Sequence, residues 1–206
     1  MSRLTAAFYN RLMSKIEQRC LREWRTSLLA DINGDVLEIG AGTGLSLTCY
    51  PQTVKHLTLS EPDQHMRSHL YKAAMQQTIP TTIIDSPGEA LQLSSGRFDA
   101  VVLCLVLCSV SDPLRVLTEA HRLLKPTGHL YFMEHVAAPN NSVRLIWQQR
   151  LEPFWKRLAG NCHLTRRTEE MILNSGFRYK KLLRQEMHPA PSFVRPTIRG
   201  IALKFL

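Results

Sequence analysis

Short apolar runs alternate with helical patterns along most of this chain, and this alternation constrains the fold more than any other feature. The runs lie at residues 36–39, 56–60, 81–85, 98–107 and 128–135. Helical patterns follow the first run after Gly44, the second through Met66 and Leu70, and the fourth over residues 113–124. Consecutive apolar positions are typical of strands that helices cover on both faces. The alternation therefore predicts an α/β fold with a doubly wound, parallel sheet.

The pattern changes after residue 135. Helices are predicted over residues 142–158 and 165–174, and two late strands over 177–183 and 198–205. We expect a single domain over residues 1–206 with four parts. These are an N-terminal helix (1–30), a cofactor-binding core (31–135), a helical insertion on the acceptor side (136–175) and C-terminal strands (176–206).

Composition limits the environment and the partners. The 26 Lys and Arg against 17 Asp and Glu give a formal net charge of +9, which indicates an anionic partner such as nucleic acid or an acidic membrane surface. No apolar run approaches the ~20 residues that span a bilayer, and Arg3, Asn10 and Arg11 interrupt any secretory signal. We therefore expect a cytoplasmic protein. Five scattered cysteines without a Cys-x-x-Cys pair predict free thiols and no metal site.

The N-terminal segment has an amphipathic pattern. Apolar residues recur every four positions, at Leu4, Phe8, Leu12, Ile16, Cys20, Trp24 and Leu28. Basic residues lie between them, which predicts a basic amphipathic helix. Such a helix either packs on the domain as a lid over the cofactor or contacts anionic lipid as a peripheral membrane anchor, and the two roles are compatible.

Three glycines at alternate positions follow the first predicted strand, in the stretch VLEIGAGTG. Gly40, Gly42 and Gly44 allow a tight turn and the close approach of a ligand to the backbone. In a doubly wound sheet, ligands bind at the carboxyl ends of the strands. Glu61 ends the second strand, 21 residues after Gly40, where a carboxylate accepts hydrogen bonds from ribose hydroxyls. The ligand is thus predicted to be a nucleoside.

The glycine spacing and one acidic residue distinguish between nucleoside cofactors. Dinucleotide folds use Gly-x-Gly-x-x-Gly and place a pyrophosphate at a helix start, whereas this chain reads Gly-x-Gly-x-Gly with Glu38 two residues before it. A carboxylate there repels a pyrophosphate and favours a cationic ligand. S-adenosylmethionine carries an ammonium and a sulfonium and no phosphate, so it is the predicted cofactor.

Over residues 36–132 the sequence resembles class I S-adenosylmethionine-dependent methyltransferases of the type 11 kind. Five further motifs resemble the animal membrane-associated thiol S-methyltransferases and their bacterial relatives described as phospholipid methyltransferases: LVLCSV (105–110), FMEHVAAP (132–139), WQQRLEPFW (147–155), GNCHLTR (160–166) and VRPTIRGIALK (194–204). The resemblance implies a Rossmann-like, mostly parallel seven-stranded sheet with the last strand antiparallel. The apolar N-terminal anchor of the animal enzymes has no counterpart in this sequence.

The resemblance also implies cofactor-binding residues: Glu38, Gly40, Ala41, Gly42, Gly44, Glu61, Pro62, Gly88, Glu89 and Leu105. One position departs from the family, because Pro87 stands where many members have an acidic residue that binds the adenine amine. Adenine is then expected to contact the backbone around Gly88 and apolar side chains, with Asp85 or Glu89 as alternative partners.

Glu134 and His135 are the catalytic candidates, because they end the fifth strand at the ligand edge of the sheet. Strand alternation points them to opposite faces, so at most one faces the acceptor. His135 is interpreted as a base or orienting group, or as a structural histidine. Secondary candidates are Cys108 as a packing residue or a substrate contact, Asp112 as a helix N-cap, Cys162 and His163 as pocket or surface residues, and Trp147, Phe154 and Trp155 as an acceptor lid or core.

A methyl transferase acting on a small lipophilic acceptor, with a thiol preferred, is the leading functional hypothesis. A phospholipid amine headgroup such as phosphatidylethanolamine is the alternative. A nucleic-acid methyltransferase would account for the charge, but the chain lacks an Asn-Pro-Pro-Tyr-like motif and a basic-aromatic strand module. A non-catalytic binding module is the least favoured class, because the cofactor motif is intact.

Overall fold

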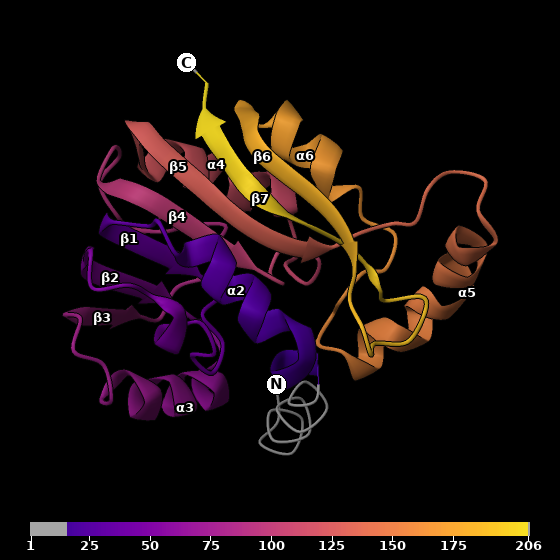
Figure 1. Ribbon diagram of the computed structural model, residues 1–206, viewed down its shortest axis with the longest axis horizontal. Helices are drawn as coiled ribbons and strands as arrows, with labels where there is room; N and C mark the ends of the chain where they lie inside the picture. The colour runs from indigo at the N-terminus through magenta and orange to yellow at the C-terminus, as the bar shows by residue number, and fades with distance from the viewer. Residues whose placement is uncertain (1–15, 206) are drawn as a thin grey trace.

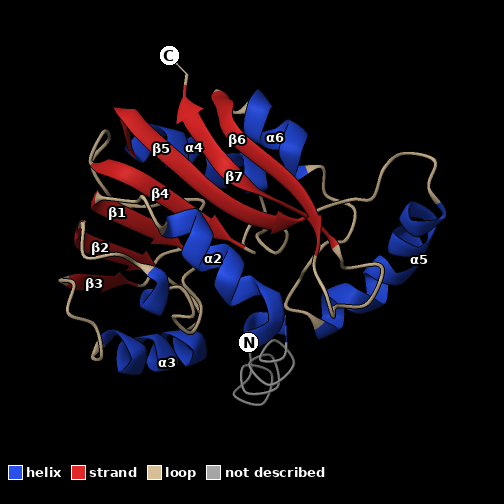
Figure 2. Cartoon of the chain, viewed as in Figure 1, coloured by secondary structure: helices blue, strands red, loops and turns tan. Residues whose placement is uncertain are grey.

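The computed structural model describes residues 16–205 and is built around a seven-stranded mixed sheet with helices on both faces (Figures 1 and 2). The strands are β1 (Gly34–Ile39), β2 (Val54–Ser60), β3 (Thr81–Ile84), β4 (Phe98–Cys104), β5 (Leu124–His135), β6 (Phe177–Glu186) and β7 (Pro196–Lys204). The helices are a π-helical turn η1 (Glu17–Leu21), α2 (Arg22–Leu29), a 3-10 turn η2 (Leu47–Cys49), α3 (Gln64–Ala74), α4 (Pro113–Leu123), α5 (Val143–Leu158) and α6 (Thr168–Asn174).

The strand order is β3-β2-β1-β4-β5-β7-β6. Strands β1 to β5 pair in parallel, and β7 runs antiparallel to both β5 and β6. This arrangement confirms the predicted Rossmann-like, mostly parallel sheet with an antiparallel last strand. The chain order reverses between β1 and β4, and ligands of such sheets bind beside that reversal, at the carboxyl ends of the strands. The glycine turn that follows β1 lies at this place.

Both faces of the central strands are buried. In β4, Ala100 and Val102 belong to the core on one side of the sheet, whereas Val101 and Leu103 belong to the core on the other. Successive side chains of a strand point to opposite faces, so an uninterrupted apolar run fills two cores at once. This burial explains why the sequence of β4 does not alternate between apolar and polar residues.

The predicted N-terminal helix over residues 1–30 lies partly outside the described residues. From Glu17 to Leu29 the chain is helical, and α2 lies across one face of the sheet (Figure 1). Leu21 and Leu29 are fully buried there, and Arg25 is only 4% exposed. This part of the segment packs on the domain. None of the described helices combines the length and the hydropathy required to cross a membrane.

Two sequence predictions of secondary structure are wrong in detail. The helix expected after Gly44 is only the short turn η2, because Pro51 follows within a few residues and β2 begins at Val54. The run of residues 98–107 is not one strand, since β4 ends at Cys104 and Leu105 takes a left-handed conformation with φ of 59°. Both departures lie at the ligand edge of the sheet.

Candidate active site

The glycine turn after β1 has the left-handed backbone that its sequence predicts. Gly40 and Gly42 have φ angles of +69° and +58°, a region that disfavours other residues. A Cβ on Gly40 would lie 2.7 Å from Cγ2 of Val106, so this glycine is required for packing. A Cβ on Gly42 would meet nothing within 4 Å. Gly42 therefore presents bare backbone to open space, as a ligand-binding turn requires.

Glu38 lies beneath this turn near the end of β1. It is 3% exposed and accepts hydrogen bonds from Ser46 Oγ at 2.6 Å and from the Tyr50 hydroxyl at 2.8 Å. Burial raises the pKa of Glu38, although both hydroxyls and Arg25 oppose that rise. The two hydrogen bonds hold Ser46 and Tyr50 against β1. They are a second reason why the chain after Gly44 forms only the short turn η2 and not a longer helix.

Glu61 follows β2 and reaches the same turn. Its Oε2 accepts the Gly42 N–H at 2.9 Å, and its Oε1 accepts the Asp63 N–H at 2.9 Å. Burial raises the pKa of Glu61, against these two hydrogen bonds. A carboxylate oxygen accepts two hydrogen bonds, so each oxygen of Glu61 retains one acceptor position beside the glycine turn.

A small cavity of about 70 Å³ opens at the turn. It is lined by Arg25, Glu38, Gly40, Ala41, Gly42, Thr43, Leu45, Ser46, Cys104 and Leu105. Of the predicted cofactor residues, the cavity brings together Glu38, Gly40, Ala41, Gly42 and Leu105. Gly44, Glu61, Pro62, Gly88 and Glu89 are not part of its lining.

Arg25 lines this cavity, although the sequence did not mark it as a cofactor residue. Its guanidinium forms a buried ion pair with Glu17, and its Nε has no hydrogen-bond partner among the described residues. Arg25 resembles the other basic residues of its helix in sequence, and its position beside Trp24 in the apolar pattern was the single signal of burial. A buried cation with an unused donor, next to bare glycine backbone, fits a ligand that carries a carboxylate, such as the methionyl end of S-adenosylmethionine.

A second, apolar cavity of about 150 Å³ adjoins the first. Its lining comprises Ile16, Leu105, Cys108, Ser109, His135, Trp155, Leu158, Ala159, Cys162, Met187, Ala190, Pro191 and Val194. Leu105 lines both cavities, and no carboxylate lies among these lining residues. We call this cavity the acceptor pocket.

Glu134 fixes the loop between the two cavities. Its Oε1 accepts the N–H groups of Val106 and Leu107 at 2.9 and 3.0 Å, and its Oε2 accepts that of Cys108 at 3.3 Å. The side chain is fully buried, and burial raises its pKa well above the usual range for glutamate. With both oxygens engaged by backbone, Glu134 positions the loop and does not line the acceptor pocket.

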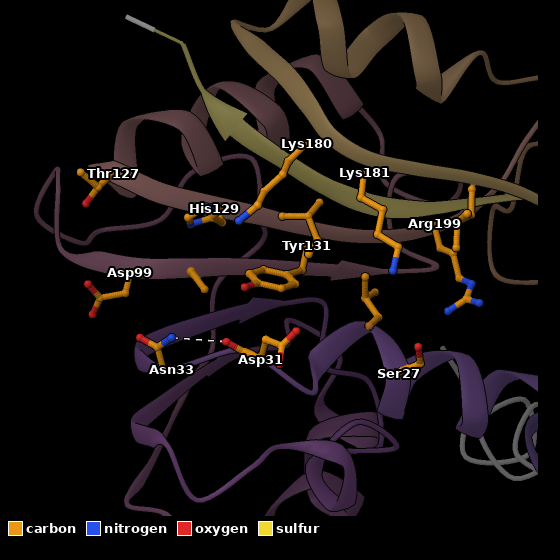
Figure 3. A pocket seen from close by; sticks show the side chains of 15 residues that line it. Ser27, Asp31, Asn33, Asp99, Thr127, His129, Tyr131, Lys180, Lys181 and Arg199 are labelled. Atoms are coloured by element: carbon orange, nitrogen blue, oxygen red, sulfur yellow. Dashed lines mark hydrogen bonds between the residues drawn. The ribbon is translucent and has the colours of Figure 1, made fainter.

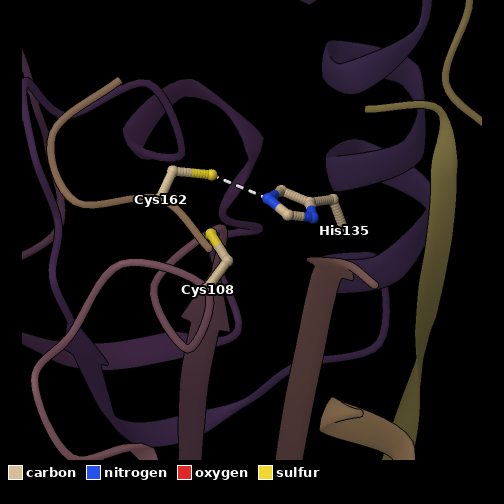
Figure 4. Close-up of side chains that lie close together, drawn as sticks. All are labelled: Cys108, His135 and Cys162. Atoms are coloured by element: carbon tan, nitrogen blue, oxygen red, sulfur yellow. Dashed lines mark hydrogen bonds between the residues drawn. The ribbon is translucent and has the colours of Figure 1, made fainter. Parts of the chain in front are cut away.

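His135 faces the acceptor pocket, opposite to Glu134. Its Nε2 lies 2.7 Å from Cys162 Sγ, while the buried Nδ1 has no partner among the described residues. The Sγ atoms of Cys108 and Cys162 and a ring nitrogen of His135 all lie within 4.8 Å of one another (Figure 4). Burial opposes protonation of His135, but neighbouring Cys108 and Glu134 outweigh it and raise the pKa of the imidazole. The grouping of these three side chains was not predicted, because they come from three separate segments.

The structure assigns different places to Asp112, Cys162 and His163. Asp112 Oδ1 accepts the N–H groups of Leu114 and Arg115, both at 3.1 Å, which confirms the predicted N-cap of α4. Cys162 lines the acceptor pocket, whereas His163 Nδ1 lies 3.3 Å from Glu152 Oε1 and is not among the lining residues.

The three aromatic residues of α5 do not act together. Trp155 lines the acceptor pocket. Trp147 and Phe154 are 52% and 66% exposed, so they belong neither to the core nor to the pocket lining.

The acidic candidates for adenine recognition already have partners. Asp85 forms two hydrogen bonds with Arg67, at 2.8 and 2.6 Å. Glu89 Oε1 accepts the N–H groups of Ser111 and Asp112 at 3.1 and 3.4 Å. The remaining expectation for adenine is contact with the backbone around Gly88 and with apolar side chains.

A larger hollow lies elsewhere among the described residues. A polar groove of about 570 Å³ is lined by Asp31, Asp99, His129, Lys180, Lys181 and Arg199, among others (Figure 3). Asp99 lies at the amino end of β4, His129 pairs with the next residue of β4, Ala100, and Asp31 precedes β1. Since doubly wound sheets bind ligands at the opposite ends, this groove is separate from the candidate active site.

The fold, the glycine turn and the acceptor pocket at the carboxyl ends of the strands define a class I methyltransferase. Residues 37–132 match the family model of the methyltransferase domain. The chain is 37% identical to the rat (Rattus norvegicus) thiol S-methyltransferase TMT1B, over 99% of this chain and 84% of the rat protein. It is 39% identical to human (Homo sapiens) TMT1B, over 82% of this chain and 70% of the human protein. The chain therefore belongs to the family of these S-adenosylmethionine-dependent methyltransferases.

Solved structures agree on the fold. A methyltransferase from Haloferax volcanii, solved with the Trm112 methyltransferase activator, is similar with a TM-score of 0.72 and 15% identity, over 98% of both chains. The YcgJ protein of Bacillus subtilis is similar with a TM-score of 0.69 and 14% identity, over 89% of this chain and 99% of that one. The enzyme class and the cofactor, S-adenosylmethionine, are as the sequence predicted.

Proposed function

We propose that the protein transfers a methyl group to the sulfur of a small lipophilic thiol. The observation that supports this most directly is the acceptor pocket, which is apolar, adjoins the glycine turn at Leu105 and carries His135 on its wall. The relatives reported above are named thiol S-methyltransferases. S-adenosylmethionine supplies an electrophilic methyl group on a sulfonium.

The cofactor is proposed to be held by the chain's own residues at the carboxyl ends of β1 and β2. The backbone of Gly40, Ala41 and Gly42 and the side chain of Glu38 bound the cavity for its methionyl part, with Arg25 positioned to pair with a carboxylate. The free acceptor positions of Glu61 suit ribose hydroxyls. Gly44, Pro62, Gly88, Glu89 and Leu105 complete the set carried over from the family resemblance.

The reaction requires little from the protein beyond alignment of the two reactants and removal of one proton. The thiol loses its proton to His135 or to solvent, its sulfur forms a bond to the methyl carbon, and the bond from that carbon to the sulfonium breaks. The products are a methyl thioether and S-adenosylhomocysteine. An apolar pocket holds the two reactants in line and excludes water, and a thiol with a pKa near 8.5 ionises without a strong base.

The described residues that line the pocket include no carboxylate, which favours a thiol over a phospholipid amine. An amine headgroup arrives as a cation, and burial of an unpaired cation costs several kcal/mol or more. A neutral lipophilic thiol enters such a pocket without that cost.

A panel of acceptors with isotopically labelled cofactor tests the proposal. Lipophilic thiols should yield labelled methyl thioethers, whereas phenols, amines and phosphatidylethanolamine should not. A charged hydrophilic thiol serves as the matched acceptor and should react with a much higher KM. If phosphatidylethanolamine is methylated and no thiol is, the phospholipid alternative replaces the thiol assignment.

A further inference from the structure

Helix α5 presents an exposed apolar stripe to solvent. Val143, Trp147, Phe154 and Leu158 are between 52% and 71% exposed. At about 100° per residue these four positions fall within an arc of roughly 60° on one side of the helix. The stripe extends along about 22 Å of helix at 1.5 Å per residue. Large contiguous apolar surfaces of this kind mark binding sites and are uncommon on free surfaces.

The charged residues that α5 itself presents beside the stripe are basic. Arg150 and Arg157 are exposed, and helical spacing puts them beside the apolar residues. Neither has an ion-pair partner among the described residues. The helix contains a single acidic residue, Glu152, and its carboxylate turns inward to accept the N–H and hydroxyl of Thr165 at 2.8 and 2.6 Å. An apolar stripe flanked by arginines, with no outward carboxylate on its own helix, is complementary to anionic lipid.

The stripe is continuous with the acceptor pocket. Leu158 belongs to the stripe and also lines the pocket. Its neighbours Trp155 and Ala159 line the pocket but are not part of the stripe. The helix lies at one end of the molecule, well away from α3 and the strands β1 to β3 (Figure 1). A flat surface can therefore approach the stripe without meeting that half of the domain.

We propose that α5 docks into the interfacial layer of an anionic phospholipid bilayer through Val143, Trp147, Phe154 and Leu158, with Arg150 and Arg157 contacting lipid phosphates. The mouth of the acceptor pocket then opens toward the lipid, so that a lipophilic acceptor reaches His135 without crossing water. The docking does not depend on the identity of the acceptor, and delivery of a lipophilic thiol rests on the proposed function.

The test is binding of the full chain to phosphatidylcholine vesicles with and without about one third phosphatidylserine. The double variant Trp147→Ser with Phe154→Ser should weaken partitioning about tenfold or more, because two aromatic side chains no longer enter the interface. Arg150→Gln with Arg157→Gln should lower the partition coefficient roughly 10- to 30-fold on the anionic vesicles only. The reason is that each arginine carries a positive charge that is attracted to the anionic surface. Turnover of a water-soluble thiol should stay unchanged in both variants.

A matched control comes from α3, where Tyr71 and Met75 are 52% and 84% exposed. Tyr71→Ser with Met75→Ser should leave vesicle binding intact. Absence of wild-type binding, or equal binding by the α5 aromatic variant, would overturn the proposal. So would a wild-type dimer in sedimentation that this variant converts to monomer, because the stripe would then be a contact between two copies of the chain.

Discussion

At the residue scale, His135 offers the sharpest test of the chemistry. As a base it acts only when neutral, and its raised pKa shifts the rise in rate to a higher pH than an unperturbed histidine would give. His135→Ala should therefore slow turnover about 10- to 1000-fold near pH 7. Most of that loss should be recovered near pH 9, where the acceptor thiol ionises unaided at a pKa of about 8.5. The measurement is the pH profile of kcat.

His163 provides the matched control for this profile, because it lies next to Cys162 in sequence but is not part of the pocket lining. His163→Ala should keep the wild-type profile. A His135→Ala enzyme with full activity at pH 7 would remove the histidine from catalysis and leave it a structural role.

Single residues were predictable where the strand that carries them was predictable. Glu38 and Glu61 lie at the ends of β1 and β2, so local sequence placed both at the ligand edge. Arg25 comes from a helix that was predicted as a lid, but no local pattern marked this residue as part of the site. For Cys162, local sequence left a pocket position and a surface position open. Their contribution depends on how α2 and the chain after α5 pack, and packing of that kind leaves no signal in one sequence.

At the element scale, the position of α5 depends on one buried side chain. Gln148 is fully buried and its Oε1 accepts the Ala138 N–H at 2.7 Å, while its Nε2 donates to Val136 and Phe193 carbonyls at 3.2 and 3.0 Å. Gln148→Leu leaves those three backbone groups without partners and should lower the free energy of unfolding by roughly 1–3 kcal/mol. Thermal and urea denaturation measure that loss.

The same change should raise the KM for the acceptor, because α5 supplies part of the pocket wall, while the affinity for S-adenosylhomocysteine stays near wild type. Gln149→Leu, at the exposed neighbouring position, is the control and should alter neither. An equal loss of affinity for both ligands in Gln148→Leu would mean that the helix supports the whole domain and not the acceptor side alone.

The elements that sequence periodicity predicts best are the ones with long uniform patterns. Helix α4 begins at Pro113 as expected, with Asp112 as its cap, and β5 ends at His135 as expected. The apolar run at 98–107 led to a predicted strand that is too long, because periodicity cannot detect where a strand stops. Here Glu134, distant in sequence, binds three successive amides and turns the chain out of β4.

At the scale of the whole molecule, cofactor binding should stabilise the domain. A ligand at one hundred times its Kd contributes about 2.7 kcal/mol to the free energy of unfolding. For a domain of this size each kcal/mol raises Tm by about 2–4 °C, so S-adenosylhomocysteine should raise Tm by roughly 5–10 °C. NAD at the same concentration should have no effect, because the Glu38 carboxylate lies beneath the turn that would have to hold a pyrophosphate. A thermal shift with NAD and none with S-adenosylhomocysteine would contradict the cofactor assignment.

Leu105 is the one residue of the described chain that lines both the small cavity at the glycine turn and the acceptor pocket. Apart from Leu105 the two sets of lining residues are disjoint, and all but Ile16 of the acceptor set follow Leu105 in the chain. Substitutions of the acceptor-lining residues after Leu105 can therefore reshape acceptor preference while the lining of the cavity at the glycine turn stays as it is. In evolutionary terms, one ancestral chain could diversify its substrates through its second half alone, and an engineer who wants a new acceptor has the same half to randomise.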